Sequence, residues 1–255
     1  MQVFAQPFWA PKGGSTDSEY EDAFYPRKKT ERKGSHFRFA VADGATETSY
    51  SGIWAKQIVR YFCKHGNDAP FDGNDFRQLQ QRWSIIVHRR PLPWYAEEKA
   101  RVGAFAAILG LVLYDEACVD SSGGRWQAIA LGDSCLVQIR GGGVLARFPL
   151  ADSAAFNNRP HLLSSNPDHN DRIVDHLRRM EGAWQPGDAF YLMTDALACW
   201  FMRELEGGGT PWHILRDFDT SGKPMPFREW LESLRAQGKI RNDDVTLLRV
   251  DVTGI

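Results

Sequence analysis

Alternating apolar and polar positions predict β-strands along most of the chain. In residues 37–41 every second side chain is large and apolar, which is the two-residue period of a half-buried strand. Continuous apolar runs bounded by turn-forming residues predict further strands. They cover the run from Gly103 to residue 114, two runs within 126–139 that join at Gly132-Asp133, residues 144–148 after a glycine-rich hairpin turn, 190–193 and 245–252.

Apolar side chains at helical spacing predict helices between several of these strands. The pattern covers residues 51–65, where Ser51 can cap the first turn, and residues 74–90. The segment before Gly103 and residues 197–205 and 227–237 are also predicted to be helical. Strands and helices mix without a strict βαβ rhythm, so we expect an α+β fold rather than a doubly wound parallel sheet.

The chain shows no internal repeat and no clear linker, which favours a single domain over residues 1–255. Residues 1–35 are rich in Gly, Pro, Lys and Glu and contain a compact acidic segment at residues 19–22. Residues 150–186 are polar, rich in His and Asp, and weakly periodic. We therefore expect them to form an excursion from the core rather than part of it.

Four of the predicted strands begin or end on an aspartate. The residues are Asp43, Asp133, Asp195 and the pair Asp243-Asp244. One aspartate at a strand end is ordinary because the side chain tolerates turns, but four of them suggest carboxylates gathered at one rim. Crowded carboxylates repel one another, and Mg²⁺ or Mn²⁺ would relieve this because these ions prefer oxygen ligands. The pattern predicts a metal-assisted hydrolase.

The composition argues against several other classes of protein. The 31 Lys and Arg residues nearly balance 32 Asp and Glu, which argues against bulk electrostatic binding to nucleic acid. The four cysteines form no C-x-x-C pair, so neither a zinc site nor a disulfide framework is indicated. The N-terminus lacks the apolar core of a signal peptide, and no run approaches the roughly 18 apolar residues of a membrane span. We expect a cytoplasmic protein without a membrane partner.

Six motifs occur in order along the chain: EYEDAF, VADGATETSYSGIWA, GAFAAILGL, ALGDSCLVQIRGG, YLMTDALACWF and NDDVTLLRV. Together they resemble the metal-dependent Ser/Thr protein phosphatases of the type 2C (PPM) class, particularly the compact bacterial branch. The resemblance runs from about residue 19 to 252. It implies a four-layer α-β-β-α sandwich of two antiparallel sheets flanked by helices, with residues 150–186 as a flap beside the metal centre.

The resemblance also implies a set of metal ligands. Asp43 would bridge two metal ions, the Gly44 carbonyl would complete the second site, and Asp195 with Asp243 would hold the first ion. Asp133 would serve a third, weaker ion. Glu21 or Asp22 would contact the second ion directly or through water. The implied cofactor is two, or three, Mg²⁺ or Mn²⁺ ions, and Asp43 and Asp195 would carry the catalysis.

Three departures from the family pattern stand out. Asp17 occupies the place of an arginine that often binds the substrate phosphate, and Lys12 could supply that charge without the bidentate fork of arginine. The histidine that follows the Asp-Gly pair in many eukaryotic members is absent, because Ala45 follows Gly44 here. Ala196 replaces the glycine that commonly follows the second aspartate, and alanine adopts positive φ less readily.

These observations favour a phosphatase that removes phosphate from serine or threonine of a protein, with a Ser/Thr kinase or its target as partner. The alternative is a non-catalytic module that keeps the fold and senses phosphoprotein or metal. A third interpretation is a zinc hydrolase built on His161, His169 and His176, since the last two are seven residues apart and could share a helical face. A solvated polar excursion explains these histidines more simply, although His176 could also donate a proton to the leaving group.

Overall fold

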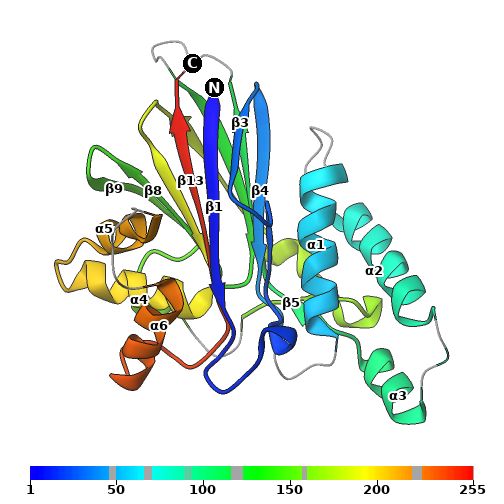
Figure 1. The fold of residues 1–255 in the computed structure, drawn as a ribbon. Coiled ribbons are helices and arrows are strands. Elements are labelled where there is room, and N and C mark those ends of the chain that lie inside the picture. The colour runs from blue at the N-terminus through cyan, green and yellow to red at the C-terminus, as the bar shows by residue number, and fades with distance from the viewer. Residues whose placement is uncertain are drawn as a thin grey trace.

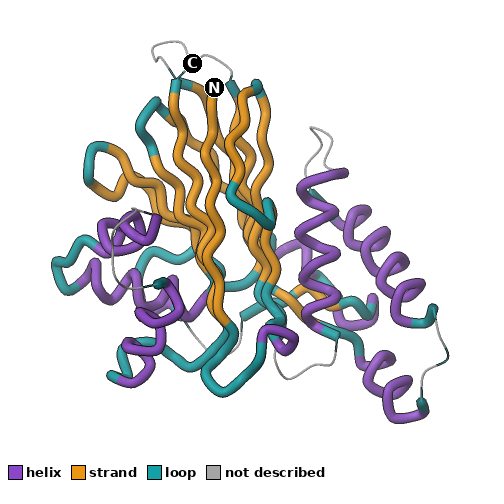
Figure 2. Tube along the Cα trace, in the orientation of Figure 1, coloured by secondary structure: helices purple, strands orange, loops and turns teal. Residues whose placement is uncertain are grey.

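The computed structural model describes residues 1–45, 50–65, 71–89, 91, 93–115, 123–156, 160–219 and 226–254. Two sheets lie face to face at its centre, and helices cover the outer face of each (Figures 1 and 2). All strand pairs among the described residues are antiparallel. The predicted α+β fold and the four-layer α-β-β-α sandwich are confirmed.

The first sheet has six strands, in the order β3-β1-β13-β12-β8-β9. They are β3 (Thr30–Lys33), β1 (Gln2–Ala10), β13 (Val245–Thr253), β12 (Ala189–Met193), β8 (Cys135–Arg140) and β9 (Gly143–Phe148). The second sheet has five strands, in the order β11-β7-β6-β4-β2. They are β11 (Arg178–Trp184), β7 (Gly124–Leu131), β6 (Ile108–Tyr114), β4 (His36–Ala42) and β2 (Ala23–Tyr25), and a separate ribbon joins β5 (Phe105–Ala106) to β10 (Leu163–Ser164).

Helices α1 (Ser51–His65) and α2 (Gly73–Val87) cover the second sheet, and α3 (Trp94–Val102) follows them on the same side (Figure 1). Helices α4 (Asp195–Glu206), α5 (Pro211–Arg216) and α6 (Phe227–Ala236) cover the first sheet. The segment before β11 holds short 3₁₀ helices at Ser153–Ala155, Pro167–His169 and Ile173–His176.

Strand β4 shows how the sequence pattern makes these layers. Phe39 and Val41 point into the core between the sheets, whereas Ala40 and Ala42 point toward the helices on the other side. Successive side chains of a strand point to opposite faces, and small residues on the helix side let α1 approach closely. Strand β6 is buried on both faces, so it is apolar at every position rather than alternating.

The predicted strands and helices are largely confirmed, but several segments differ. Strand β1 was not predicted. Its side chains alternate between half-buried and buried only as far as Ala5, and Gln6 and Pro7 then interrupt the pattern. Strands β7 and β8, predicted to join at Gly132-Asp133, lie in different sheets, so the chain crosses the sandwich there. Gly132 permits this crossing with a φ of +103°, and a Cβ on it would lie 2.5 Å from the Cβ of Ala107.

The prediction that residues 150–186 stand apart from the core is wrong for their last part. Strand β11 pairs with β7 along its whole length and forms an edge of the second sheet. Its exposed pattern misled the sequence analysis, since five of its seven residues are exposed.

Ser51 is the first residue of α1, and its hydroxyl donates to the carboxylate of Glu21.

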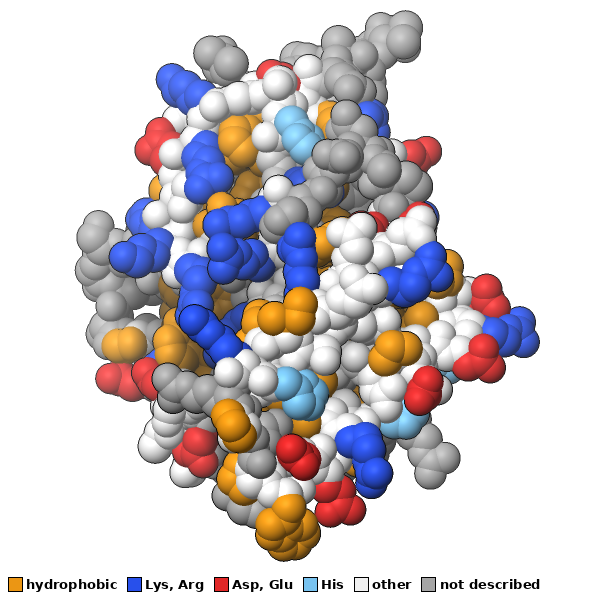
Figure 3. All heavy atoms as spheres, turned by 90° about the vertical axis from the view of Figure 1, so that its right-hand side faces the viewer, with side chains coloured by type: hydrophobic (Ala, Val, Ile, Leu, Met, Phe, Trp, Pro, Cys, Tyr) orange, Lys and Arg blue, Asp and Glu red, His pale blue; other side chains and the backbone are white. Residues whose placement is uncertain are grey.

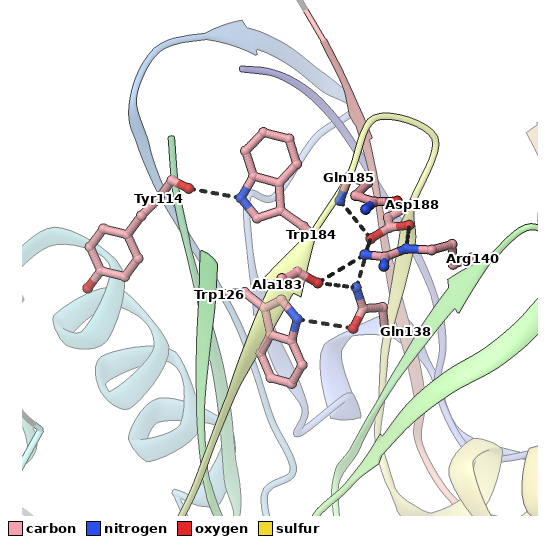
Figure 4. A network of polar contacts seen from close by, with 8 residues as sticks. All are labelled: Tyr114, Trp126, Gln138, Arg140, Ala183, Trp184, Gln185 and Asp188. Atoms are coloured by element: carbon pink, nitrogen blue, oxygen red, sulfur yellow. Dashed lines mark hydrogen bonds and ion pairs between the residues drawn. The ribbon is translucent and has the colours of Figure 1, made fainter. Parts of the chain in front are cut away.

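A buried polar network ties the sheets together at the end where β12 begins (Figure 4). Asp188, only 1% exposed, accepts hydrogen bonds from Gln138 Nε2 at 2.8 Å and from Arg140 Nε and Nη2 at 2.8 and 2.7 Å. Gln138 in turn accepts from the indole of Trp126, at 3.0 Å. Because every member of this network has a partner, its burial is compatible with a stable core.

Positive side chains are distributed unevenly over the surface. On the face that α1 to α3 cover, Lys and Arg side chains gather in a band (Figure 3). Helix α1 contributes exposed Lys56, Arg60 and Lys64, which are one turn apart on one side of the helix. The overall charge of −1 therefore includes a local excess of positive side chains on this face.

Candidate metal centre

Three of the predicted ligands meet in space. One carboxylate oxygen from each of Asp43, Asp133 and Asp195 lies within 4.8 Å of the other two. Asp43 directly follows β4, Asp133 lies in the crossing between β7 and β8, and Asp195 follows β12 at the start of α4. Strand ends from both sheets therefore bring together residues as far apart in the sequence as Asp43 and Asp195.

The backbone around Asp43 is held in place by hydrogen bonds. Its N–H donates to the carbonyl of Ala107 at 3.3 Å, and its carbonyl accepts from Ala107 N at 2.8 Å. Gly44 then lies directly under the acidic segment near the N-terminus. A Cβ on Gly44 would lie 2.7 Å from the carbonyl oxygen of Glu21 and 3.1 Å from the backbone of Ser51, so only glycine fits this contact.

Asp195 begins α4, where its Oδ1 accepts from the N–H of Ala196 at 2.5 Å. A carboxylate at a helix N-terminus is favoured by the helix dipole. Ala196 is the second residue of α4 and is not among the described residues with positive φ. Alanine in place of glycine therefore causes no backbone strain here, and this departure from the family pattern does not disturb the site.

Asp244 ties three segments together beside the cluster. Its Oδ1 accepts from the N–H of Lys12 at 2.8 Å, and its Oδ2 accepts from the N–H of Glu21 at 2.7 Å. The two donors go to different carboxylate oxygens, and an amide side chain here would present an NH₂ group, which cannot accept, to one of them. Asp244 is only 6% exposed and therefore positions the acidic segment of residues 19–22.

Within that acidic segment, Asp22 is the more deeply placed of the two candidate ligands. Asp22 is 1% exposed; its Oδ2 accepts from Thr246 Oγ1 at 2.7 Å, and its Oδ1 has no hydrogen-bond partner in the described structure. Glu21, by contrast, accepts from Ser51. An unsatisfied buried carboxylate oxygen is costly, and a cation would satisfy it.

The crowding of these acids changes their titration. Loss of hydration raises the pKa of Asp43 well above its usual range, and the charges of Asp22, Asp133 and Asp243 raise it further. Burial also raises the pKa of Asp133 and, strongly, that of Asp22. The charge of Arg241 acts in the opposite direction on Asp43 and Asp133. Without a cation, this arrangement disfavours the ionised state that metal binding needs.

Arg241 is a site residue that the sequence analysis missed. Its guanidinium pairs with the carboxylates of Asp195 and of Asp243, the latter at 3.1 Å. Asp243 is thus connected to Asp195 by the guanidinium of Arg241, which pairs with both carboxylates. The only signal in the sequence was a cation two residues before Asp243, which carries no meaning until the fold brings Asp195 beside it.

A pocket of about 160 Å³ adjoins the cluster. Asp133 and Asp195 line it together with Arg203, Lys239 and Arg241. A larger pocket of about 500 Å³ lies on the outer face of the second sheet, where its lining includes none of the clustered carboxylates. Because the chemistry requires the carboxylates, the smaller pocket is the relevant one for the site.

The remaining predicted residues do not belong to the carboxylate cluster. The charge of Lys12 helps to lower the pKa of the exposed Glu19 carboxyl, although hydrogen bonds from Thr16 are the larger cause. Asp17 pairs with Arg228 at 2.9 Å. In the described ranges no metal-binding group contains the histidines of the third interpretation. His161 stacks on His176 with ring centroids 3.5 Å apart, and His169 stacks on Phe105 instead of sharing their face.

Comparison with known proteins identifies the family. The family model described as "Protein phosphatase 2C" matches residues 15–243, which is most of the chain. The chain belongs to the protein phosphatase 2C family. Membership supports phosphatase activity, and the carboxylate cluster is compatible with dependence on divalent metal ions. No curated protein matches the sequence.

Solved structures share the fold at low sequence identity. The serine/threonine phosphatase PstP/Ppp of Mycobacterium tuberculosis has a TM-score of 0.61 at 14% identity, over 99% of this chain and 100% of that one. The catalytic domain of PstP in complex with two manganese ions has a TM-score of 0.57 at 15% identity, over 98% and 99%. PppA of Pseudomonas aeruginosa, a regulatory component of its T6SS, has a TM-score of 0.51 at 16% identity, over 98% and 97%.

No helix in the described ranges is long and apolar enough to cross a membrane.

Proposed function

We propose that this 2C-family protein hydrolyses phosphoserine and phosphothreonine on proteins with the help of two Mg²⁺ or Mn²⁺ ions. The observation that carries the proposal is the convergence of Asp43, Asp133 and Asp195 within 4.8 Å at one end of the sandwich. The solved relative of similar fold that contains two manganese ions supports the number of ions.

The donor set fits hard divalent cations. Every candidate ligand is an oxygen atom, whereas zinc would favour histidine or cysteine. Burial, together with the charges of neighbouring carboxylates, raises the pKa of Asp43 and of Asp22, and the buried Oδ1 of Asp22 lacks a hydrogen-bond donor in the described structure. The proposed ligands are the following: Asp43, the Gly44 carbonyl, Asp195, Asp243, Asp133, and Glu21 or Asp22.

Divalent ions bound by these residues would supply an activated water for in-line attack on phosphorus and would offset the charge on the phosphate. The chain's own contribution is positional. Hydrogen bonds to Ala107 fix the Asp43 backbone, the first turn of α4 orients Asp195, and Asp244 holds the segment that carries Glu21 and Asp22. A rigid arrangement of this kind reduces the reorganisation required during reaction.

The substrate would be a phosphorylated protein, such as a Ser/Thr kinase or its target. Lys12 remains a candidate for binding the substrate phosphate. The alternative, a non-catalytic sensor of phosphoprotein or metal, loses one of its two supports because Ala196 lies unstrained in α4. The other support, the replacement of the phosphate-binding arginine by Asp17, persists.

The test is hydrolysis of p-nitrophenyl phosphate and of a phosphothreonine peptide, with Mn²⁺ or with EDTA. We expect Mn²⁺-dependent turnover in the wild type and a loss of at least about 100-fold in Asp195→Asn, in line with the transition-state stabilisation that such a group supplies. Asp171→Asn, which changes an exposed aspartate, is the matched control. A wild type that binds Mn²⁺ but hydrolyses neither compound would support the non-catalytic alternative.

A further inference from the structure

Arg241 occupies an unusual position for an arginine in a metal-binding protein. It lies between α6 and β13, and its guanidinium pairs with both Asp195 and Asp243, which are proposed to hold the same metal ion. One positive charge of the protein therefore offsets part of the charge of the two carboxylates in the metal-free state. An ion and a guanidinium cannot both occupy the space between the same carboxylate oxygens, so Arg241 must move away when the metal binds.

The surroundings of Arg241 allow this movement. Its side chain is 50% exposed, and it belongs to a surface connection that also contains Gly238 with a φ of +64°. Arg241 lines the pocket of about 160 Å³ beside the carboxylates. After release from Asp195 and Asp243, the guanidinium can remain at that pocket while facing the space in front of the cluster.

The pocket is suited to an anion. Arg203 and Lys239 line it with Arg241, and in the described structure neither of these two makes an ion pair. Arg203 and Asp133 both act on the pKa of the Cys199 thiol, one lowering it and the other raising it, although burial is the main cause of its elevation. Positive side chains thus lie close to the carboxylates, where the phosphate of a substrate would meet the metal ions.

The usual source of a phosphate-binding arginine is missing from this chain. Asp17 stands in its place and pairs with Arg228 on the surface. Arginine is suited to phosphate because its planar fork donates two parallel hydrogen bonds, which a lysine such as Lys12 cannot do.

We propose that Arg241 is an exchangeable counter-ion that holds Asp195 and Asp243 in the metal-free protein and binds the substrate phosphate once metal has displaced it. This inference rests on the proposed function. It predicts that substitution of Arg241 strengthens metal binding and weakens phosphate binding. Loss of Arg241 removes a competitor and a repelling charge from the metal site, but it also removes a ligand from the phosphate.

The experiment compares Arg241→Gln, Arg241→Lys and wild type in two binding assays that need no turnover. Calorimetric titration of the metal-free protein with Mn²⁺ should show binding about three- to tenfold tighter in Arg241→Gln, the scale of one or two partly exposed ion pairs. Titration of the Mn²⁺-loaded protein with inorganic phosphate should show binding at least about tenfold weaker, as for loss of a charge-assisted hydrogen bond. Arg241→Lys keeps the positive charge, so its affinities for Mn²⁺ and for phosphate should lie between those of the wild type and those of Arg241→Gln.

Arg89→Gln is the matched control, because Arg89 is an exposed arginine at the end of α2 and the change removes the same charge. It should alter neither affinity. The inference is overturned if Arg241→Gln binds Mn²⁺ more weakly or binds phosphate as tightly as the wild type. Failure of the proposed function is distinguishable, because it shows as an inactive wild type whatever the outcome of the two titrations.

Activity adds a third readout. If the wild type hydrolyses p-nitrophenyl phosphate, Arg241→Gln should raise KM by at least about tenfold at saturating Mn²⁺, while the Mn²⁺ concentration needed for half-maximal rate should fall. A merely structural role for Arg241 would instead lower the thermal stability and weaken both metal and phosphate binding, which would also overturn the inference.

Discussion

The carboxylate cluster should make the metal-free protein less stable than a variant with one acid removed. The chosen change is Asp133→Asn, which keeps the shape of a buried side chain while removing its charge. Two unit charges 4.8 Å apart, the largest separation within the cluster, repel by about 3.5 kcal/mol at an effective dielectric constant of about 20. Asp133 takes part in two such pairs, with Asp43 and with Asp195.

The expected gain is smaller than the sum of these two terms. Attraction to Arg241 offsets about one pair, and uptake of a proton by a carboxyl of raised pKa relieves part of the other. We therefore expect Asp133→Asn to stabilise the metal-free protein by about 1–3 kcal/mol, since the remaining repulsion is of that order. For a chain of this size that corresponds to a rise in Tm of about 2–10 °C.

The assay is thermal unfolding in EDTA and again in excess Mn²⁺, with Asp171→Asn as the exposed control. Asp133→Asn should unfold at a higher temperature than the wild type in EDTA, whereas added Mn²⁺ should raise the Tm of the wild type more. A lower Tm for Asp133→Asn in EDTA would refute the reasoning, because it would mean that the charge of Asp133 stabilises the metal-free fold.

The same cluster predicts a pH dependence of stability. Folding raises the pKa of Asp43 and Asp133, so these carboxyl groups favour the folded state at low pH, where they are protonated. That contribution to the free energy of unfolding is lost as the pH rises through the raised pKa values. In EDTA the Tm advantage of Asp133→Asn over wild type should therefore grow with rising pH, and a constant difference would contradict this. Gly44→Ala should cost about 1–3 kcal/mol in urea unfolding and weaken Mn²⁺ binding, since the new Cβ would lie 2.7 Å from the Glu21 carbonyl. Asp188→Ala should cost about 2–4 kcal/mol, because Arg140 and Gln138 lose a buried partner, yet leave Mn²⁺ affinity by calorimetry unchanged because the network lies at the other end of β12.

The candidate ligands could be predicted from the sequence because they lie where strands end. Asp43, Asp133 and Asp195 follow apolar runs whose periodicity is local, and the order of six motifs places those runs in one fold. Which sheet each strand joins is not a local property. Strands β7 and β8 are separated by three residues but pair in different sheets, and only the positive φ at Gly132 marks the crossing.

Features that depend on distant partners could not be predicted. Arg241 gains its role from Asp195, which is 46 residues away in the sequence. Strand β11 was hidden by its exposed side chains, because an edge strand with one solvated face does not need the apolar residues that identify a buried strand. Asp244 is recognisable in the sequence only as the second of two adjacent aspartates, whereas its two backbone donors come from Lys12 and Glu21.

The pairing of β1 with β13 has a consequence for how this protein folds during synthesis. Residues 2–10 pair in full register with residues 245–253, and these two strands lie side by side within the first sheet. Strand β1 therefore keeps one edge unpaired until residues 245–253 have been synthesised. Asp22 and Asp243 are likewise far apart in the sequence, so the acidic groups around Asp43 come together only after residue 243 has been added. Such long-range closure slows folding.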